Sequence, residues 1–183
     1  MLAHKRQRML NNRLQRGVTL IEMVVTIAIM AILIALAVPS FKNILANAQI
    51  RTAAQALNDG LQLARVEAIR RNERVIFTKG TQSAWTVTVE SDASTVQTRP
   101  YTEGSNSATV TVTPNNATKV TFNSLGRVVA NTDTSSSISQ LDIDVPTTLI
   151  AAADSHELRI TITSGGAIRL CDPNAASGVG MGC

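Results

Sequence analysis

Residues 16–39 read RGVTLIEMVVTIAIMAILIALAVP, and this stretch decides how the rest of the chain is interpreted. Its inner part, residues 18–38, is apolar apart from Thr19, Glu22 and Thr26. About 20 such residues, wound as a helix, span the hydrocarbon core of a bilayer, which is about 30 Å thick. The stretch therefore predicts a transmembrane helix over residues 18–38.

The basic residues of the chain are concentrated before this stretch. The formal net charge is +4, from 17 Lys and Arg against 13 Asp and Glu. Five of the basic residues precede Val18, which leaves 12 basic residues against 13 acidic ones in the remainder. Because Lys and Arg resist translocation, the pattern predicts a cytoplasmic N-terminus and an extracytoplasmic head. The near-neutral remainder gives no overall electrostatic case for binding a polyanion.

A secretory signal peptide is the simpler alternative for the same stretch. The basic leader, the apolar run and the small residues of Ala35-Leu36-Ala37 fit cleavage after Ala37. The run nevertheless exceeds the roughly 7 to 15 residues of a signal-peptide core, and Glu22 lies inside it. A charged residue within a membrane helix costs about 2.5 to 3.5 kcal/mol on insertion scales, so Glu22 indicates a partner that simple anchoring would not need.

Residues 16–22, RGVTLIE, resemble the prepilin signature of type IV pilins and type II secretion pseudopilins. The resemblance implies that a prepilin peptidase cuts between Gly17 and Val18, and that Val18 becomes the N-methylated first residue. It also implies that the Glu22 carboxylate meets the amino terminus of a neighbouring subunit, since pairing makes a buried charge tolerable. Val18 departs from the usual Phe, and the leader is long unless the chain starts at Met9.

Pro39 is expected to end or kink the membrane helix, because it lacks an amide hydrogen and clashes with the preceding turn. A second, amphipathic helix is predicted within residues 39–72, where apolar or small residues recur at a spacing of three and four. Its core-facing side comprises Ile50, Ala53, Ala54, Leu57, Leu61, Ala64, Ala68 and Ile69. We expect this side to seat the head on the stem rather than to form a groove for a partner.

The composition changes after Asn72 towards Thr, Val and Ser with turn residues. Alternating runs predict half-buried antiparallel strands at residues 75–78, 85–90, 109–113, 119–122, 141–145 and 158–162. Residues 91–107, 131–139 and 147–155 read as loops. The predicted fold class is α+β, in which a leader (1–17), a membrane helix (18–38) and an amphipathic helix (39–72) precede an antiparallel sheet or sandwich head (73–183).

Two cysteines, Cys171 and Cys183, lie near the C-terminus with eleven residues between them. Their spacing fits no zinc motif, and after the leader only His156 could add a nitrogen ligand. A disulfide is the better interpretation, and it requires an oxidising compartment.

Three further segments narrow the resemblance. Residues 57–74 (LNDGLQLARVEAIRRNER), residues 122–127 (FNSLGR) and the closing residues 166–183 resemble the GspH/FimT branch of minor pilins and pseudopilins. Pro39 and the cysteine-closed tail resemble the FimT and FimU minor pilins more than the secretion pseudopilin. The resemblance implies a single-pass inner-membrane protein with a periplasmic head, which joins an extracellular type IV pilus as an initiating or tip subunit. A type II secretion pseudopilin is the alternative.

No catalytic constellation is visible, and no cofactor or metal is predicted. His156 is interpreted as a surface residue at the start of a strand. Asp142 and Asp144 share one face of a strand, but the alternation makes that face solvent-exposed rather than catalytic.

DNA binding is the alternative to assembly into a filament. In some FimT proteins a C-terminal Gly-Arg-x-Arg stretch binds DNA, and the corresponding residues here are Gly166-Ala167-Ile168-Arg169, without the first arginine. Arg169 remains, and Arg127 follows another glycine. An isolated arginine neutralises one phosphate and gives weak, salt-sensitive binding, so a plain surface role is the competing interpretation.

Overall fold

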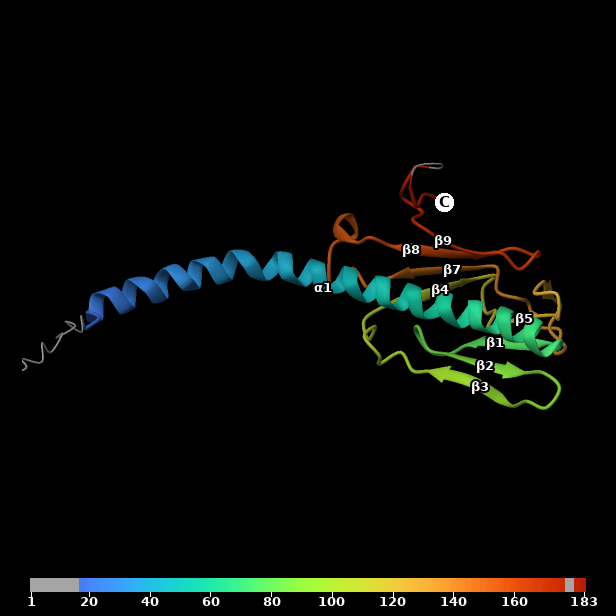
Figure 1. Cartoon of the computed structure of the whole chain (residues 1–183). Helices are drawn as coiled ribbons and strands as arrows, with labels where there is room; N and C mark the ends of the chain where they lie inside the picture. Colours follow the sequence, from blue (N-terminus) through green and yellow to red (C-terminus); the bar gives the residue numbers. More distant parts are fainter. Residues whose placement is uncertain (1–16, 177–179) are drawn as a thin grey trace, which may run out of the picture. The chain divides into compact units, whose positions relative to one another are not determined.

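The computed structural model describes residues 17–176 and 180–183, so the predicted leader up to Arg16 lies outside the described residues. The chain divides into two compact units, Met1–Pro39 and Ser40–Cys183. Helix α1 (Leu20–Arg71) contributes its first part to one unit and the remainder to the other. Figure 1 shows the elements in chain order.

Pro39 lies within α1, so of the two effects expected there an end of the helix is excluded. Proline removes one backbone hydrogen bond, but Leu36 and Ala37 before it are strong helix formers that favour continuation. The kink stays a prediction.

The helix ends because Asn72 adopts the left-handed conformation, with a φ of 57°. The Glu73 amide then donates to the Ala68 carbonyl at 3.2 Å, and the Asn72 amide donates to the Ile69 carbonyl at 3.3 Å. These two bonds form a Schellman motif, which satisfies carbonyls of the last turn. Asn72, which the sequence analysis included in the amphipathic helix, therefore caps it from outside.

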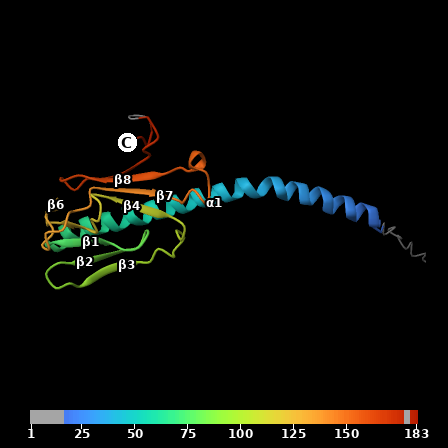
Figure 2. The ribbon, with the colours of Figure 1, turned by 180° about the vertical axis from the view of Figure 1, so that it is seen from behind.

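The second unit contains two antiparallel sheets. The five-stranded sheet has the order β3-β2-β1-β5-β6, and the four-stranded sheet has the order β4-β7-β8-β9. Figures 1 and 2 show the part of α1 in this unit running alongside both sheets, so the predicted α+β class is confirmed. The elements are β1 (Val75–Lys79), β2 (Trp85–Val89), β3 (Thr95–Arg99), β4 (Thr109–Thr113), β5 (Lys119–Phe122), β6 (Val128–Val129), β7 (Gln140–Asp144), the 3-10 helix η1 (Ala152–Asp154), β8 (Leu158–Ile162) and β9 (Ile168–Cys171).

The six strands expected from alternation are present, within about one residue at their ends. Residues 91–107, expected to be a loop, instead contain β3, which pairs with β2. This edge strand is mostly exposed on both faces, so its sequence shows no apolar alternation. Strands β6 and β9 were also not predicted, because β6 has only two residues and none of the first three residues of β9 is fully buried.

The core forms where α1 meets the two sheets. The predicted core-facing residues from Ile50 to Ala68 are fully buried and join one cluster with Phe77, Phe122 and Ile160. Ile69 is the exception, since it is 49% exposed. It follows Ala68 directly and therefore lies about 100° further round the helix, at the margin of the apolar stripe.

Gly60 lets the aromatic rings approach the helix. A Cβ atom at Gly60 would lie 2.7 Å from Trp85 Cδ2 and Cε2, and 2.9 Å from Phe77 Cε2. These two rings pack with their centroids 6.1 Å apart. A glycine inside a helix is usually unfavourable, so its presence here is explained by the space that the rings require.

Gly60→Ala is expected to lower the free energy of unfolding by about 1 kcal/mol. Ala gains about 1 kcal/mol of helix propensity over Gly, but overpacking a core costs about 1 to 3 kcal/mol. Urea unfolding of the detergent-solubilised chain, followed by far-ultraviolet circular dichroism, measures the difference. Asp59→Ala is the control, because Asp59 is exposed and adjacent. A stabilised Gly60→Ala protein would contradict the packing argument.

Candidate assembly segment

The side chain of Thr19 caps the N-terminus of α1. The Glu22 amide donates to the Thr19 hydroxyl at 3.3 Å, and the Met23 amide donates to the Thr19 carbonyl at 3.2 Å. Thr19 is therefore the N-cap, and Glu22 occupies the third helical position. This cap was not predicted, although Thr-x-x-Glu before an apolar run is a capping-box signature.

Within the first unit, no described residue buries the part of α1 that follows this cap. Its most apolar window has a mean hydropathy of 2.8 and none of it is buried, so by length and composition it could cross a membrane. Polar atoms inside it are satisfied locally, since the Thr26 hydroxyl donates to the Met23 carbonyl at 2.9 Å. The exposed large side chains are Val18, Leu20, Ile21, Met23, Val24, Val25, Ile27, Ile29, Met30, Ile32, Leu33, Ile34, Leu36 and Val38.

Glu22 is exposed in the first turn of this apolar helix. A carboxylate there interacts favourably with the positive end of the helix dipole, worth about 0.3 to 1 kcal/mol. Within residues 17–176 and 180–183, no Lys, Arg or His lies within ion-pair distance of it. If this helix lay in lipid, the dipole would offset only part of the cost of the charge.

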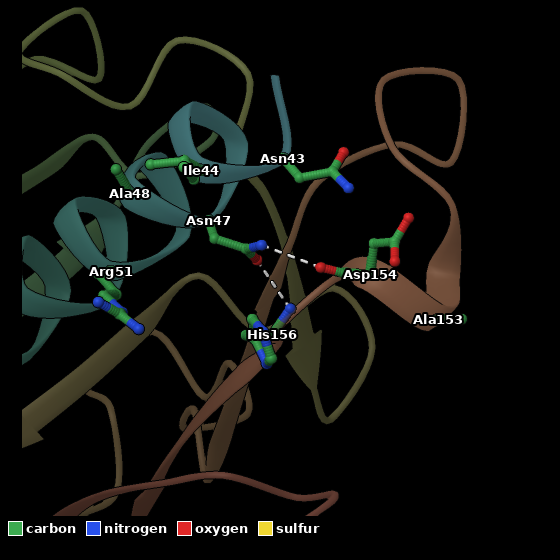
Figure 3. Close-up of a pocket in the computed structure, with 8 residues that line it drawn as sticks. All are labelled: Asn43, Ile44, Asn47, Ala48, Arg51, Ala153, Asp154 and His156. Atoms are coloured by element: carbon green, nitrogen blue, oxygen red, sulfur yellow. Dashed lines mark hydrogen bonds between the residues drawn. The ribbon is translucent and has the colours of Figure 1, made fainter. Parts of the chain in front are cut away.

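In the second unit, Asn47 fastens a loop of the head to α1 (Figure 3). Its side-chain amide donates to the Asp154 carbonyl at 2.9 Å, and its oxygen accepts the His156 amide hydrogen at 2.8 Å. Nothing in the sequence around Asn47 signalled this role. An open pocket of about 500 Å³ lies beside these bonds. His156 lines it and is exposed, as predicted, and its imidazole has no role in these bonds.

The C-terminal loop is held on β9 by a disulfide and by hydrogen bonds. Cys171 and Cys183 are bonded, with Cα atoms 5.1 Å apart, as the sequence analysis expected. The Arg169 guanidinium donates to the Gly182 carbonyl at 2.9 Å, and the Asp172 amide donates to the Met181 carbonyl at 2.7 Å. Arg169 therefore has a structural contact within the loop, whatever else it binds.

The turn that carries Arg127 lies against the hairpin before Arg169. The Val128 amide donates to the Ser164 carbonyl at 3.2 Å. A Cβ at Gly166, where φ is 82°, would lie 1.8 Å from the Gly126 carbonyl oxygen. The fold thus brings both glycine-arginine stretches to the same end of the head, and the side chain of Arg127 is exposed there.

Asp142 and Asp144 are each occupied by separate partners. Asp142 accepts a hydrogen bond from Arg159 at 2.5 Å across the β7–β8 pair. Asp144 accepts hydrogen bonds from the Val145 amide at 2.7 Å and from the Ser155 hydroxyl. The two carboxylates therefore have separate partners rather than a shared one. The described part of the chain holds no cluster of three His, Cys, Asp or Glu that could bind a metal.

The charged side chains near the C-terminal end of α1 also form ion pairs. Glu67 accepts hydrogen bonds from Arg70 and Arg71, at 2.6 and 2.7 Å. These two bonds lower the pKa of Glu67 from 4.5 to about 2. The groups are ordinary helix-end ion pairs, so they add no candidate site.

Two family comparisons match the chain. Residues 53–166 match the family described as type II transport protein GspH, and residues 12–38 match the prokaryotic N-terminal methylation motif. The second match contains Gly17, Val18 and Glu22.

Solved structures of the type IV minor pilin FimU of Pseudomonas aeruginosa strain PAO1, in two crystal forms, share the fold. Each is 18% identical with a TM-score of 0.50 and covers 70% of this chain, which matches 92% and 97% of the respective FimU chains. No curated protein matches. The GspH match covers more than half of this chain, so the chain belongs to the GspH family, as a type IV pilin-like subunit of the GspH/FimT/FimU type.

Proposed function

We propose that the chain is a minor pilin that enters the inner membrane through residues 18–38, is processed at its N-terminus and is then built into a type IV pilus. The observation that carries this proposal is Glu22, an exposed carboxylate in the first turn of an uncovered apolar helix. Anchoring alone requires no such carboxylate, whereas lateral assembly of helices provides a partner for it.

Processing would create the group that Glu22 needs. Cleavage by a prepilin peptidase between Gly17 and Val18 frees an α-amine, and methylation of that nitrogen leaves it able to carry a proton. Val18 precedes the N-cap Thr19 and lies outside α1, so its nitrogen is not held against the helix. The amine of a neighbouring subunit can then approach Glu22, and a paired charge is tolerable in a low-dielectric surrounding where a single one is not.

Two features support the proposed orientation, with the head outside the cytoplasm. The leader carries five basic residues, and such residues remain on the cytoplasmic side. The head carries the Cys171–Cys183 disulfide, which persists in oxidising compartments and is rare in the cytosol. The two arguments are independent, since one concerns translocation and the other redox chemistry.

We also propose that the chain acts as a minor pilin at the start or tip of the pilus, because its fold is similar to that of FimU, which is itself a type IV minor pilin. The description of the family as type II transport keeps a pseudopilus as the alternative filament. The partners in either case are the prepilin peptidase, other pilin subunits and, before assembly, the inner membrane.

DNA binding by the head is a second candidate, favoured by one observation. The bond from Val128 to Ser164 brings the Arg127 turn close to the hairpin that leads into Arg169. Two arginines at one end of the head would contact neighbouring phosphates. The contact between Arg169 and Gly182 argues for a structural role instead.

Processing is expected to leave a mature chain that begins with Val18 and carries one added methyl group on its nitrogen. N-terminal sequencing and intact mass of the protein from the native host measure both. Gly17→Val should block the cut, because a branched side chain replaces the residue that the peptidase accepts. A mature chain that begins at Val38 would instead identify a secreted protein released by signal peptidase.

Glu22→Ala is expected to abolish incorporation into pili while leaving insertion and cleavage intact, because the ion pair with the neighbouring amine is lost. Glu22→Gln separates the charge from the helix cap, since a capping box accepts Gln as well as Glu. We expect Glu22→Gln to fail like Glu22→Ala. Immunoblots of sheared pili and membranes measure the two pools.

Thr26→Ala is the matched control for Glu22, because the Thr26 hydroxyl donates to the Met23 carbonyl of its own helix. It should enter pili normally. Normal incorporation of Glu22→Gln would show that Glu22 acts as a cap, and normal incorporation of Glu22→Ala would remove the assembly mechanism.

Gel-shift titrations of the detergent-solubilised chain test the DNA candidate. If Arg127 and Arg169 each contact a phosphate, each change to Ala should weaken binding at every sequence and reduce the salt slope by about 1. Arg99→Ala is the control, since Arg99 lies on β3, at the opposite edge of the five-stranded sheet from β6, while β9 belongs to the other sheet. Absence of a shift at low salt would end this candidate.

A further inference from the structure

In the described part of the head, the two sheets have four outer strands, β3 and β6 in one sheet and β4 and β9 in the other. An outer strand presents unpaired backbone groups that can accept a strand of another chain, and proteins usually protect it. Three of the four are protected. Strand β3 pairs irregularly with β2 and ends at Arg99-Pro100, β6 has only two residues, and β9 is tied to the C-terminal loop through Cys171 and Arg169.

Strand β4 lacks these protective features. Its residues 109–113 read TVTVT, without proline or charge, and they pair with β7 in an unbroken register. The longer stretch 104–118 carries no charged side chain either. The threonines of β4 are exposed and its two valines pack against the core, so the strand has an alternating pattern that a further strand can continue.

The free backbone groups of β4 belong to Val110 and Val112. The Thr113 carbonyl accepts the Ser139 amide hydrogen at 2.9 Å, so Thr113 directs its backbone groups to the side of β7. Successive residues of a strand direct these groups to opposite sides, so Val110 and Val112 direct theirs away from β7. Among the described residues, none forms a hydrogen bond with these groups.

An open cleft of about 400 Å³ lies along this free edge. Residues 110–112 all line it, and they include side chains from both faces of the strand, so the cleft lies at the edge of the sheet rather than on one face. Within the described residues, β7 contributes nothing to the lining, which places the cleft at the edge away from β7. The remaining lining comes from Lys79 and Gly80, where β1 ends, and from residues 115–118.

Lys79 is the charged residue of the cleft. Its side chain is half-buried, and its ammonium group donates to the Gly80 carbonyl at 3.0 Å. Among residues 17–176 and 180–183, no carboxylate lies within ion-pair distance of it. Burial lowers the pKa of Lys79, because the charged form loses contact with water. An opposite charge nearby favours the charged form, so the cleft is complementary to a carboxylate.

We propose that an extended segment of another filament subunit adds to the free edge of β4 as a further strand and places a carboxylate at Lys79. Such addition takes its affinity from backbone hydrogen bonds and its specificity from alternate side chains. Apolar residues of the incoming segment would lie opposite Val110 and Val112, as Ile143 and Leu141 of β7 do on the other edge. The inference rests on the proposed function only in naming a filament subunit as the source.

The four-stranded sheet would then continue into a second subunit. This contact is separate from the one proposed for Glu22, which belongs to the other compact unit. A subunit whose segment lacks the carboxylate would bind more weakly, so Lys79 would help to select the neighbour.

Peptide binding to the detergent-solubilised full chain tests the proposal. The probe copies residues 140–145, QLDIDV, because β4 already pairs with this strand on its other edge. The peptide carries an N-terminal fluorophore and an amidated C-terminus, and a second peptide has asparagine at both aspartate positions. Fluorescence anisotropy measures the affinity of each for the wild-type chain, for Lys79→Gln and for Lys42→Gln. The last is the matched control, because Lys42 is exposed on α1 and does not line the cleft.

The aspartate peptide is expected to bind the wild-type chain about two- to fivefold more tightly than the asparagine peptide, as for a partly exposed ion pair. Lys79→Gln should remove this difference, and Lys42→Gln should retain it. Methylating the backbone nitrogens of the leucine and isoleucine should abolish binding, because these residues would exchange backbone hydrogen bonds with Val110 and Val112. Methylating the nitrogens of the two aspartates, which would point away from β4, should leave binding intact.

The proposal is overturned if neither peptide binds, if the two bind equally, or if both methylated forms bind alike. The sequence TVTVT is symmetric about Thr111, so two copies of β4 are the competing pair. Because the native cysteines are paired, disulfide-linked dimers of Thr111→Cys would assign the edge to a second copy instead. None of these outcomes involves Glu22, so the proposed function is judged by its own experiments.

Discussion

The uncovered apolar surface of residues 18–38 is the constraint on which the interpretation of this molecule depends. None of the large side chains in this segment is buried, and each apolar residue left in water would cost roughly 1.5 to 3 kcal/mol relative to burial. Water is therefore an unfavourable surrounding for this segment, and lipid or the helices of other subunits are the surroundings that would cover it.

That requirement gives Glu22 its meaning. The same carboxylate would be unremarkable on a soluble helix, where Thr-x-x-Glu is a common start and the dipole rewards an acid in the first turn. In lipid the charge changes from a small gain to a liability. In water, the Glu22 carboxylate needs only its interactions with the start of its own helix. In a membrane it would need a cation from a second molecule, which a filament subunit has and a simple anchor lacks.

Much of the fold could be predicted from the sequence, because the helical and the strand periodicities are both regular. The three-and-four spacing from Ile50 to Ala68 and the strict alternation at residues 141–145 and 158–162 each have one buried face. Prediction failed where burial does not produce a pattern, as in β3, which is exposed on both faces, and at Ile69, beside the stripe.

The site was predictable to a different extent. Glu22 is conspicuous because a charge interrupts an apolar run, and the disulfide follows from two cysteines with no other partner. Asn47 and Gln49 were invisible, since each acts on backbone groups far away in the chain. Such contacts depend on the tertiary fold, and a polar residue on a polar helix face gives no sign of them.

The disulfide and the basic leader bear on the same question from opposite ends of the chain. In the chain-entropy account, closing a loop of this length stabilises the folded state by roughly 3 kcal/mol, but only where the thiols stay oxidised. A cytosolic head would lose that contribution. The Asp172 and Arg169 contacts would then have to hold the loop alone. The proposed orientation, with the head outside the cytoplasm, would keep these thiols oxidised and would leave the basic leader on the cytoplasmic side.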